Sequence, residues 1–166
     1  MNEPLASDPN VSQTIVCRVV RGHQVASGIN GDPRFPLGTL RMQAPHFLAL
    51  GLDIYAFHFG TLNVSIAPLQ YSVLEPRITF RGVKWHPIEP AEDFSFFDCC
   101  LVVPGTTSIP GLVYYPHPAT KREHFQSPEV LELLLPFVEG LSYGMSLTIR
   151  IPSSQILIES PATGPD

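Results

Sequence analysis

The clearest alternation of hydrophobic and polar residues lies between Thr61 and Ile66, where every second residue is hydrophobic. The two alternating sets are Leu62, Val64 and Ile66 on one side and Thr61, Asn63 and Ser65 on the other. Successive side chains of a β-strand point to opposite faces of the sheet. The pattern therefore predicts a strand with one face toward a core and a second face of hydroxyl and amide groups.

Further strands are predicted at 14–20, 78–88, 94–103 and 147–151, where hydrophobic residues alternate or fill both faces. Residues 37–42 also indicate a short strand. Eighteen prolines and few charges are typical of short strands separated by turns. We therefore expect a mostly β protein, a small antiparallel β-barrel with one or two short helices. Its single domain would cover 14–158, with flexible tails at 1–13 and 159–166.

Two short helices are predicted between the strands. One covers 45–50, with Pro45 at the first helical position and Gly51 as the stop signal. The other covers 127–135, because Ser127 is a good N-cap, Pro128 and Glu129 favour a helix start, and a proline follows at position 136. The inward side of this second helix would carry leucines.

Two loops are candidates for binding. Residues 28–34 are rich in glycine and end in Arg34, so backbone N–H groups and a guanidinium could meet phosphate oxygens, although an ordinary hairpin loop fits equally well. Residues 105–126 read as a long connection that ends in a basic cluster containing Lys121 and Arg122. This connection is either a solvated surface loop or a lid whose cations reach a phosphate.

Polar and aromatic rows offer further candidate chemistry. Thr61 and Asn63 would present neutral oxygen donors, which hold Mg²⁺ only in company with a phosphate, or they simply form the wet face of a strand. The aromatic residues of 53–59 would either stack on a flat ring or belong to the core.

Composition removes several classes of function. The chain has 44% hydrophobic and 15% charged residues and a net charge of -5, which indicates a globular protein and argues against a nucleic-acid partner. We see no signal peptide and no hydrophobic run near the roughly 18 residues of a membrane span, so we expect a cytoplasmic protein without a membrane partner. The three cysteines have no metal or disulfide spacing. The oligomeric state stays open.

Four short motifs follow one another along the chain. They are Gly60-Thr61-Leu62-Asn63, Phe80-Arg81-Gly82-Val83-Lys84 with Pro87-Ile88, Asp98-Cys99-Cys100-Leu101-Val102-Val103-Pro104, and Glu129-Val130-Leu131-Glu132-Leu133-Leu134 with Pro136. In this order they resemble the archaeal CTP-dependent riboflavin kinases, and the likeness covers most of residues 15–151. The resemblance implies a cradle-loop barrel that transfers a phosphoryl group from a nucleoside triphosphate to riboflavin, giving FMN.

The resemblance also implies roles for individual residues. Thr61 and Asn63 would bind Mg²⁺ with the nucleotide, and Glu132 would contact the flavin, with Thr120 as the nearest candidate for a second flavin contact. The nucleotide would be held by Gly28, Asn30, Gly31 and Arg34. Lys121 and Arg122 belong to the long loop, which the resemblance does not cover, and they could supply further cations.

The chain departs from the family after Pro136. The kinases carry a basic Met-Lys-Leu-Arg-Glu stretch there, whereas this chain has Phe137-Val138-Glu139-Gly140. Two functions therefore stay open: a kinase of the riboflavin type, or a barrel that binds another small ligand or a protein partner without this catalysis.

Overall fold

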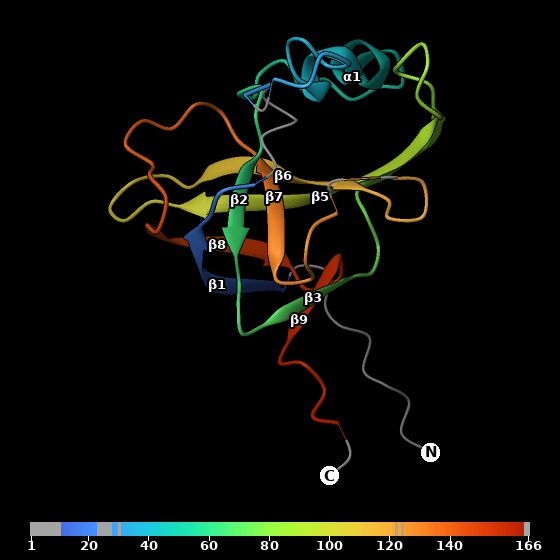
Figure 1. Cartoon of the computed structure of the whole chain (residues 1–166). Coiled ribbons are helices and arrows are strands. Elements are labelled where there is room, and N and C mark those ends of the chain that lie inside the picture. Colours follow the sequence, from blue (N-terminus) through green and yellow to red (C-terminus); the bar gives the residue numbers. More distant parts are fainter. Residues whose placement is uncertain (1–10, 23–27, 30, 122, 124, 165–166) are drawn as a thin grey trace.

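The computed structural model describes residues 11–22, 28–29, 31–121, 123 and 125–164 of the 166-residue chain. These residues form nine strands and one α-helix (Figure 1). In chain order the elements are β1 (Ser12–Val19), α1 (Thr39–Ala49), β2 (Leu62–Ser65), β3 (Gln70–Val73), β4 (Ile78–Val83), β5 (Glu92–Val102), β6 (Ile109–Pro116), β7 (Val130–Leu134), β8 (Ser146–Pro152) and β9 (Ile156–Glu159).

Six strands close into an antiparallel barrel in the order β5-β6-β7-β2-β1-β8, and β8 returns to β5. The closing contact pairs residues 100–102 of β5 with 148–150 of β8. Strand β4 extends the sheet from the other part of β5, and β3 and β9 form a separate two-stranded ribbon. The predicted fold class, a mostly β protein built on a small antiparallel barrel with a short helix, is confirmed.

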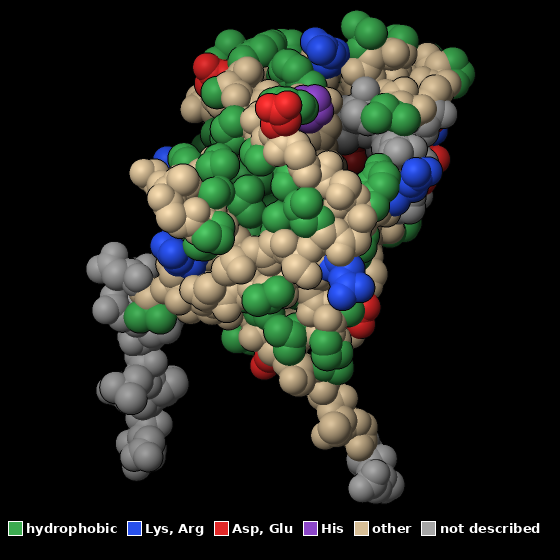
Figure 2. Space-filling model, turned by 90° about the vertical axis from the view of Figure 1, so that its left-hand side faces the viewer, with side chains coloured by type: hydrophobic (Ala, Val, Ile, Leu, Met, Phe, Trp, Pro, Cys, Tyr) green, Lys and Arg blue, Asp and Glu red, His purple; other side chains and the backbone are tan. Residues whose placement is uncertain are grey.

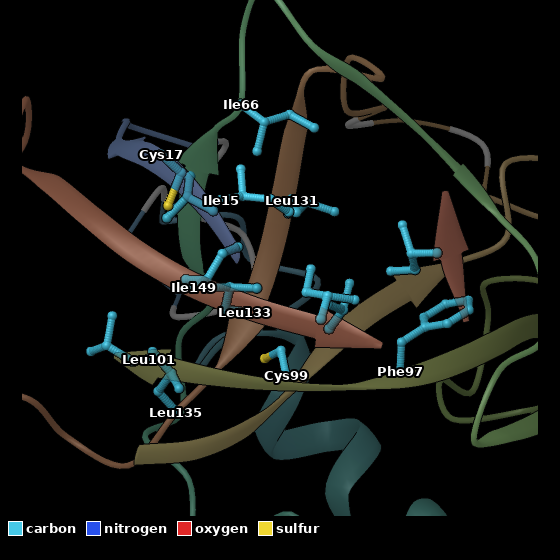
Figure 3. Close-up of a cluster of buried hydrophobic side chains, with 14 residues drawn as sticks. Ile15, Cys17, Ile66, Phe97, Cys99, Leu101, Leu131, Leu133, Leu135 and Ile149 are labelled. Carbon is cyan, nitrogen blue, oxygen red and sulfur yellow. The ribbon is translucent and has the colours of Figure 1, made fainter. Parts of the chain in front are cut away.

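The barrel interior is filled by hydrophobic side chains that all six strands contribute (Figure 3). Val64, Leu133 and Ile149 are completely buried there. Burying a side chain of this size stabilises the fold by about 1.5–3 kcal/mol relative to leaving it exposed. Leu62 and Ile66 also belong to this cluster, so the predicted core-facing row of β2 is confirmed.

Helix α1 lies at the top of Figure 1 and covers a second hydrophobic cluster, which we call the outer layer. The outer layer contains Phe35, Leu40, Ala44, Phe47, Ile54, Phe80, Val83, Trp85, Phe94, Phe96, Leu112, Tyr114 and Leu134. The Phe47 ring of α1 makes edge contacts with Phe94 and Phe96 of β5, at centroid distances of 5.0 and 5.2 Å. The helix is therefore held on the sheet mainly by aromatic packing.

The helix predicted at 127–135 is wrong, because this segment contains strand β7. Strand β7 pairs with both β2 and β6. Its Leu131 and Leu133 face the barrel interior, while Leu134 packs in the outer layer. A strand that is buried on both faces reads as a hydrophobic run without alternation, and its pairing outweighs helix-start signals.

The prediction that 105–126 is a connection without secondary structure is also wrong. Strand β6 occupies residues 109–116 and pairs with β5 and β7. Pro110 and Pro116 lie near its two ends, so the ladder between them still has its N–H donors.

The strand predicted at 37–42 is wrong, and the helix does not start at Pro45 as predicted. Helix α1 begins at Thr39 and continues through Pro45. Proline removes one helical hydrogen bond, but Leu40, Ala44 and Phe47 are fully buried on the sheet. Their burial holds the helix together. The aromatic segment 53–59 forms no strand; Phe57 and Phe59 pack against the outer layer.

Among the described residues no helix is suited to cross a membrane. Helix α1 has 11 residues, whereas a spanning helix needs about 20.

Candidate functional site

A cavity of about 540 Å³ opens beside the mouth of the barrel. It is lined by the end of β1, by β2, by the end of β7 and by the segment 135–143 that follows it, and Ile29 and Lys121 join from two loops. The 135–143 segment lies on the left-hand side of Figure 1. Figure 2 shows this side, and hydrophobic side chains gather on it. Thr61, Asn63 and Glu132 supply polar groups to the otherwise largely hydrophobic lining.

These three residues are brought together by strand pairing. Asn63 of β2 lies directly opposite Glu132 of β7 in the antiparallel ladder. Thr61 Oγ1 donates a hydrogen bond to Glu132 Oε1 at 3.1 Å, and Asn63 Nδ2 donates to the Thr61 carbonyl oxygen at 3.3 Å. Two neutral oxygens and one carboxylate therefore converge on one edge of the cavity.

Two residues fix the Asn63 side chain, which is only 8% exposed. Gln126 Nε2 donates to Asn63 Oδ1 at 2.9 Å. On the other side, a Cβ added to Gly22 would lie 2.4 Å from Asn63 Nδ2 and 2.6 Å from Oδ1. The absence of a side chain at Gly22 thus makes room for the amide, and Gln126 sets its orientation.

Among the described residues that line this cavity, Lys121 is the only lysine or arginine. Phe137 and Tyr143 stand at its rim and are 75% and 57% exposed. The ring centroids of Phe137 and His58 are 5.7 Å apart. The guanidinium of Arg21 lies over the ring of Tyr143, 5.1 Å from the ring centroid. After Pro136, the cavity is thus lined by the hydrophobic side chains of Phe137, Val138 and Leu141, which we call the hydrophobic wall.

The loop 28–34 reaches the cavity through Ile29, whereas Arg34 lies elsewhere. Its guanidinium is 2.7 Å from Asp32, 3.1 Å from Glu89 and 2.5 Å from Glu123. Hydrogen bonds to these three carboxylates raise the pKa of Arg34. The Arg34 guanidinium is therefore paired with these carboxylates and does not line the large cavity.

Of the other described residues named for nucleotide and flavin binding, Gly28, Gly31 and Thr120 do not line the large cavity, but Thr120 lines a second cavity together with Lys121 and Glu132. Gly28 and Gly31 form a turn in which the Gly31 N–H donates to the Gly28 carbonyl oxygen. Thr120 Oγ1 accepts a hydrogen bond from the Asp93 N–H at 2.9 Å. Asn30 and Arg122 lie outside the described residues.

A second, smaller cavity of about 70 Å³ lies between α1 and the sheet. Gln43, Trp85, Glu92 and Tyr114 line it, and it shares Lys121 and Glu132 with the large cavity. Trp85 Nε1 donates to Glu92 Oε2 at 2.9 Å. Burial raises the pKa of the Glu92 carboxyl, while the bond from Trp85 and the charge of Lys121 act in the opposite direction.

Sequence reasoning missed Gln126 and Gly22. It named Thr120, Lys121 and Glu132 of the second cavity, but not Gln43, Trp85 or Glu92. No pattern in the sequence marks Gln43 or Glu92, because their role depends on how α1 lies on β5 and β6. Among the described residues, no group of three or more histidine, cysteine or acidic side chains forms a metal cage.

Comparison with protein-family models gives no match for this chain. Comparison with curated proteins gives no match either.

Proposed function

We propose that this protein is a phosphotransferase of the riboflavin kinase type, which transfers a phosphoryl group from a nucleoside triphosphate to riboflavin in the large cavity. The observation that carries the proposal is the convergence of Thr61, Asn63, Glu132 and Lys121 on one cavity. These residues come from three separate segments of the chain. The kinase-like motifs contain Thr61, Asn63 and Glu132, whereas Lys121 lies in the loop that the resemblance does not cover.

The donor set fits Mg²⁺. This ion prefers oxygen ligands and is usually held by one or two carboxylates together with substrate phosphates. Thr61 Oγ1, Asn63 Oδ1 and the Glu132 carboxylate are all oxygen donors, and Thr61 Oγ1 is 3.1 Å from Glu132 Oε1. These residues would hold Mg²⁺ beside the nucleotide, where the ion would supply positive charge to neutralise the phosphates.

The chain's own residues would then position the reactants. Lys121 would pair with a phosphate oxygen, because a charged donor is strongest there. Glu132 would accept the proton of the attacking hydroxyl as the new O–P bond forms and the bond to the nucleoside diphosphate breaks. The hydrophobic wall that contains Phe137 would cover a flat ring and exclude water from the reacting atoms.

FMN formation from riboflavin, measured with CTP and separately with ATP in the presence of Mg²⁺, tests the proposal. Asn63→Ala should abolish turnover without unfolding the protein. Lys121→Ala should weaken nucleotide binding about 10- to 150-fold, the worth of one charged hydrogen bond. Ser65→Ala on the same strand and Lys84→Ala outside the cavity are the matched controls. A wild-type protein that forms no FMN with either nucleotide would contradict the proposal.

A second candidate is a barrel that binds a flat small molecule without transferring phosphate. It is favoured by the hydrophobic wall after Pro136 and by the single lysine of the cavity lining. Riboflavin and FMN would then raise the melting temperature, since a ligand that binds only the folded state stabilises it. Binding without FMN formation distinguishes this candidate from the kinase.

A further inference from the structure

The side of helix α1 that points away from the sheet is hydrophobic over its second half. Arg41, Pro45 and Leu48 are spaced i, i+4 and i+7, so they share one face of the helix, and all three are exposed. Leu50 and Tyr55 follow the helix and are 51% and 49% exposed, like Leu48 at 48%. We call Pro45, Leu48, Leu50 and Tyr55 the α1 patch. Hydrophobic side chains that gather on one exposed surface mark an interaction site.

Backbone and ring contacts hold the members of the α1 patch close together. The Leu50 N–H donates to the His46 carbonyl oxygen at 3.2 Å, so Leu50 stays on the last turn of α1. The ring of Tyr55 makes an edge contact with the ring of Phe59 at a centroid distance of 5.6 Å. The guanidinium of Arg41 lies over the same Phe59 ring, 4.9 Å from its centroid. Tyr55 therefore lies beside the start of the exposed helical face, and Leu50 lies beside its end.

The α1 patch does not belong to a small-molecule site. Its residues line neither the large nor the small cavity. The opposite side of α1 packs on the sheet through the buried side chains of Leu40, Ala44 and Phe47. Small ligands bind in concave sites, whereas the exposed face of a helix at the top of the molecule (Figure 1) is a surface that another protein can cover.

The charges of this region favour a second copy of the chain as that protein. Between Phe35 and Gly60, Arg41 and Asp53 are the only residues charged at pH 7, so the region is neutral in a chain of net charge -5. Two copies that approach through it repel each other least. Neither residue has an ion-pair partner among the described residues, and Asp53 Oδ1 accepts the Tyr55 N–H at 2.8 Å. A hydrophobic surface with one cation and one anion at separate positions is complementary to its own copy.

We propose that the α1 patch is the contact surface of a homodimer with two-fold symmetry. Every residue pair of such a contact occurs twice. Arg41 of each copy faces Asp53 of the other copy, and the leucines and Tyr55 of the α1 patch pack between these two ion pairs. Removal of this hydrophobic surface from water drives the association, and tyrosine and arginine are residue types that often dominate protein contacts. The proposal does not depend on the proposed function, because the α1 patch takes no part in phosphate transfer.

Sedimentation equilibrium of the wild-type chain over a range of concentrations tests the proposal, and a reversible monomer–dimer equilibrium is expected. Leu48→Asp places a charge in the α1 patch and should weaken dimerisation at least about tenfold, because an unpaired charge is costly to bury. Leu74→Asp makes the same change outside the α1 patch at a position of similar exposure, 52%, and should leave the dimer unchanged. Circular dichroism shows which variants fold; if Leu48→Asp does not, the charge reversals below carry the test.

Charge reversal tests the contact pair itself. Arg41→Asp alone brings two carboxylates together in both contacts, and Asp53→Arg alone brings two guanidiniums together, so each should weaken dimerisation about tenfold or more. The double change Arg41→Asp, Asp53→Arg restores opposite charges and should recover the dimer. An equimolar mixture of the two single variants should also dimerise, because both contacts of the mixed dimer again join an acid and a base.

The mixture separates a direct contact from a loss of folding, since a misfolded variant is not rescued by a second misfolded variant. The proposal is overturned if the wild type stays monomeric at about 1 mM, a concentration at which even weak specific contacts form. It is also overturned if Leu48→Asp folds and dimerises as tightly as Leu74→Asp, or if neither the double variant nor the mixture recovers the dimer. FMN formation plays no part in these measurements, so failure of the kinase proposal leaves this one unaffected.

Discussion

The two buried layers of this protein differ in what they enclose. The barrel interior contains hydrophobic side chains and two cysteine thiols, and its polar backbone groups are paired around the closed ring. The outer layer packs aromatic rings around α1 and also buries the polar side chains of Thr39 and Gln43. Buried polar groups cost free energy unless they are paired. The contrast indicates that the barrel interior specifies the fold, whereas the outer layer gives up some stability to keep polar groups beside a cavity.

The largest expected effect comes from Phe47→Ala. Phe47 is completely buried and contacts three phenylalanines, so the substitution should lower the free energy of unfolding by about 3–5 kcal/mol. Phe125→Ala, at a position that is 53% exposed, is the control and should change stability little. Urea unfolding measures both. If Phe47→Ala lowered the free energy of unfolding as little as Phe125→Ala does, α1 would contribute little to stability.

Leu133→Ala tests the barrel interior. Leu133 is completely buried, and its truncation should cost about 2–5 kcal/mol. Strand β7 borders both layers, so the fluorescence of Trp85 in the outer layer should report the same unfolding midpoint as far-UV circular dichroism. Two separate midpoints would show that the layers unfold independently. Ile88→Ala, at a position that is 84% exposed, serves as the control.

Glu92 makes the stability of the outer layer depend on pH. Its pKa in the folded state lies above its value in the unfolded chain, so the folded state binds the proton more readily. Its contribution is therefore fully present below the unfolded pKa and is lost as the pH rises through the folded one. The wild type should gain stability relative to Glu92→Gln on acidification, as unfolding at several pH values would show. A difference that does not change with pH would contradict this prediction.

The smallest effect is expected from the double change Gln43→Leu, Tyr114→Phe. It removes the hydrogen bond that the Tyr114 hydroxyl donates to Gln43 Oε1 at 2.8 Å, but it also removes the Gln43 amide N–H, for which no described residue is an acceptor. Replacing both partners by nonpolar groups of similar shape is often nearly neutral. The melting temperature should stay close to that of the wild type, while each single change should lower it more. A large loss in the double variant would show that this polar pair is needed for stability.

The sequence predicts best where a strand has one hydrophobic and one polar face. Leu62 and Val64 of strand β2 face the barrel as the alternation predicts, although Asn63 on the other face is also buried, and the predicted strands 14–20, 94–103 and 147–151 overlap β1, β5 and β8. It predicts poorly where both faces of an element are covered. Strand β7 has no alternation to distinguish it from a helix, since Leu134 contacts the outer layer while Leu133 fills the barrel.

The candidate site was predictable only in part for the same reason. Thr61 and Asn63 stand out because they interrupt hydrophobic residues with a period of two. The partners of these residues do not stand out, because Gln126 and Gly22 reach Asn63 through the folding of distant loops. The charge of Arg34 was visible in the sequence, but its three carboxylate partners lie up to 89 positions away, at Glu123. Such pairings depend on tertiary structure that a local pattern does not encode.

Closure of the barrel also bears on self-association. An unpaired strand edge is a template on which a second molecule can add a strand, and a closed ring offers none. Among the described strands, β4 remains at an open edge of the larger sheet, and it is an unsuitable template. It has six residues, its pairing with β5 is irregular between Phe80 and Val83, and it carries the charge of Arg81. In the larger sheet, protection against fibril-like assembly is therefore provided by topology at six strands and by local irregularity and charge at the seventh.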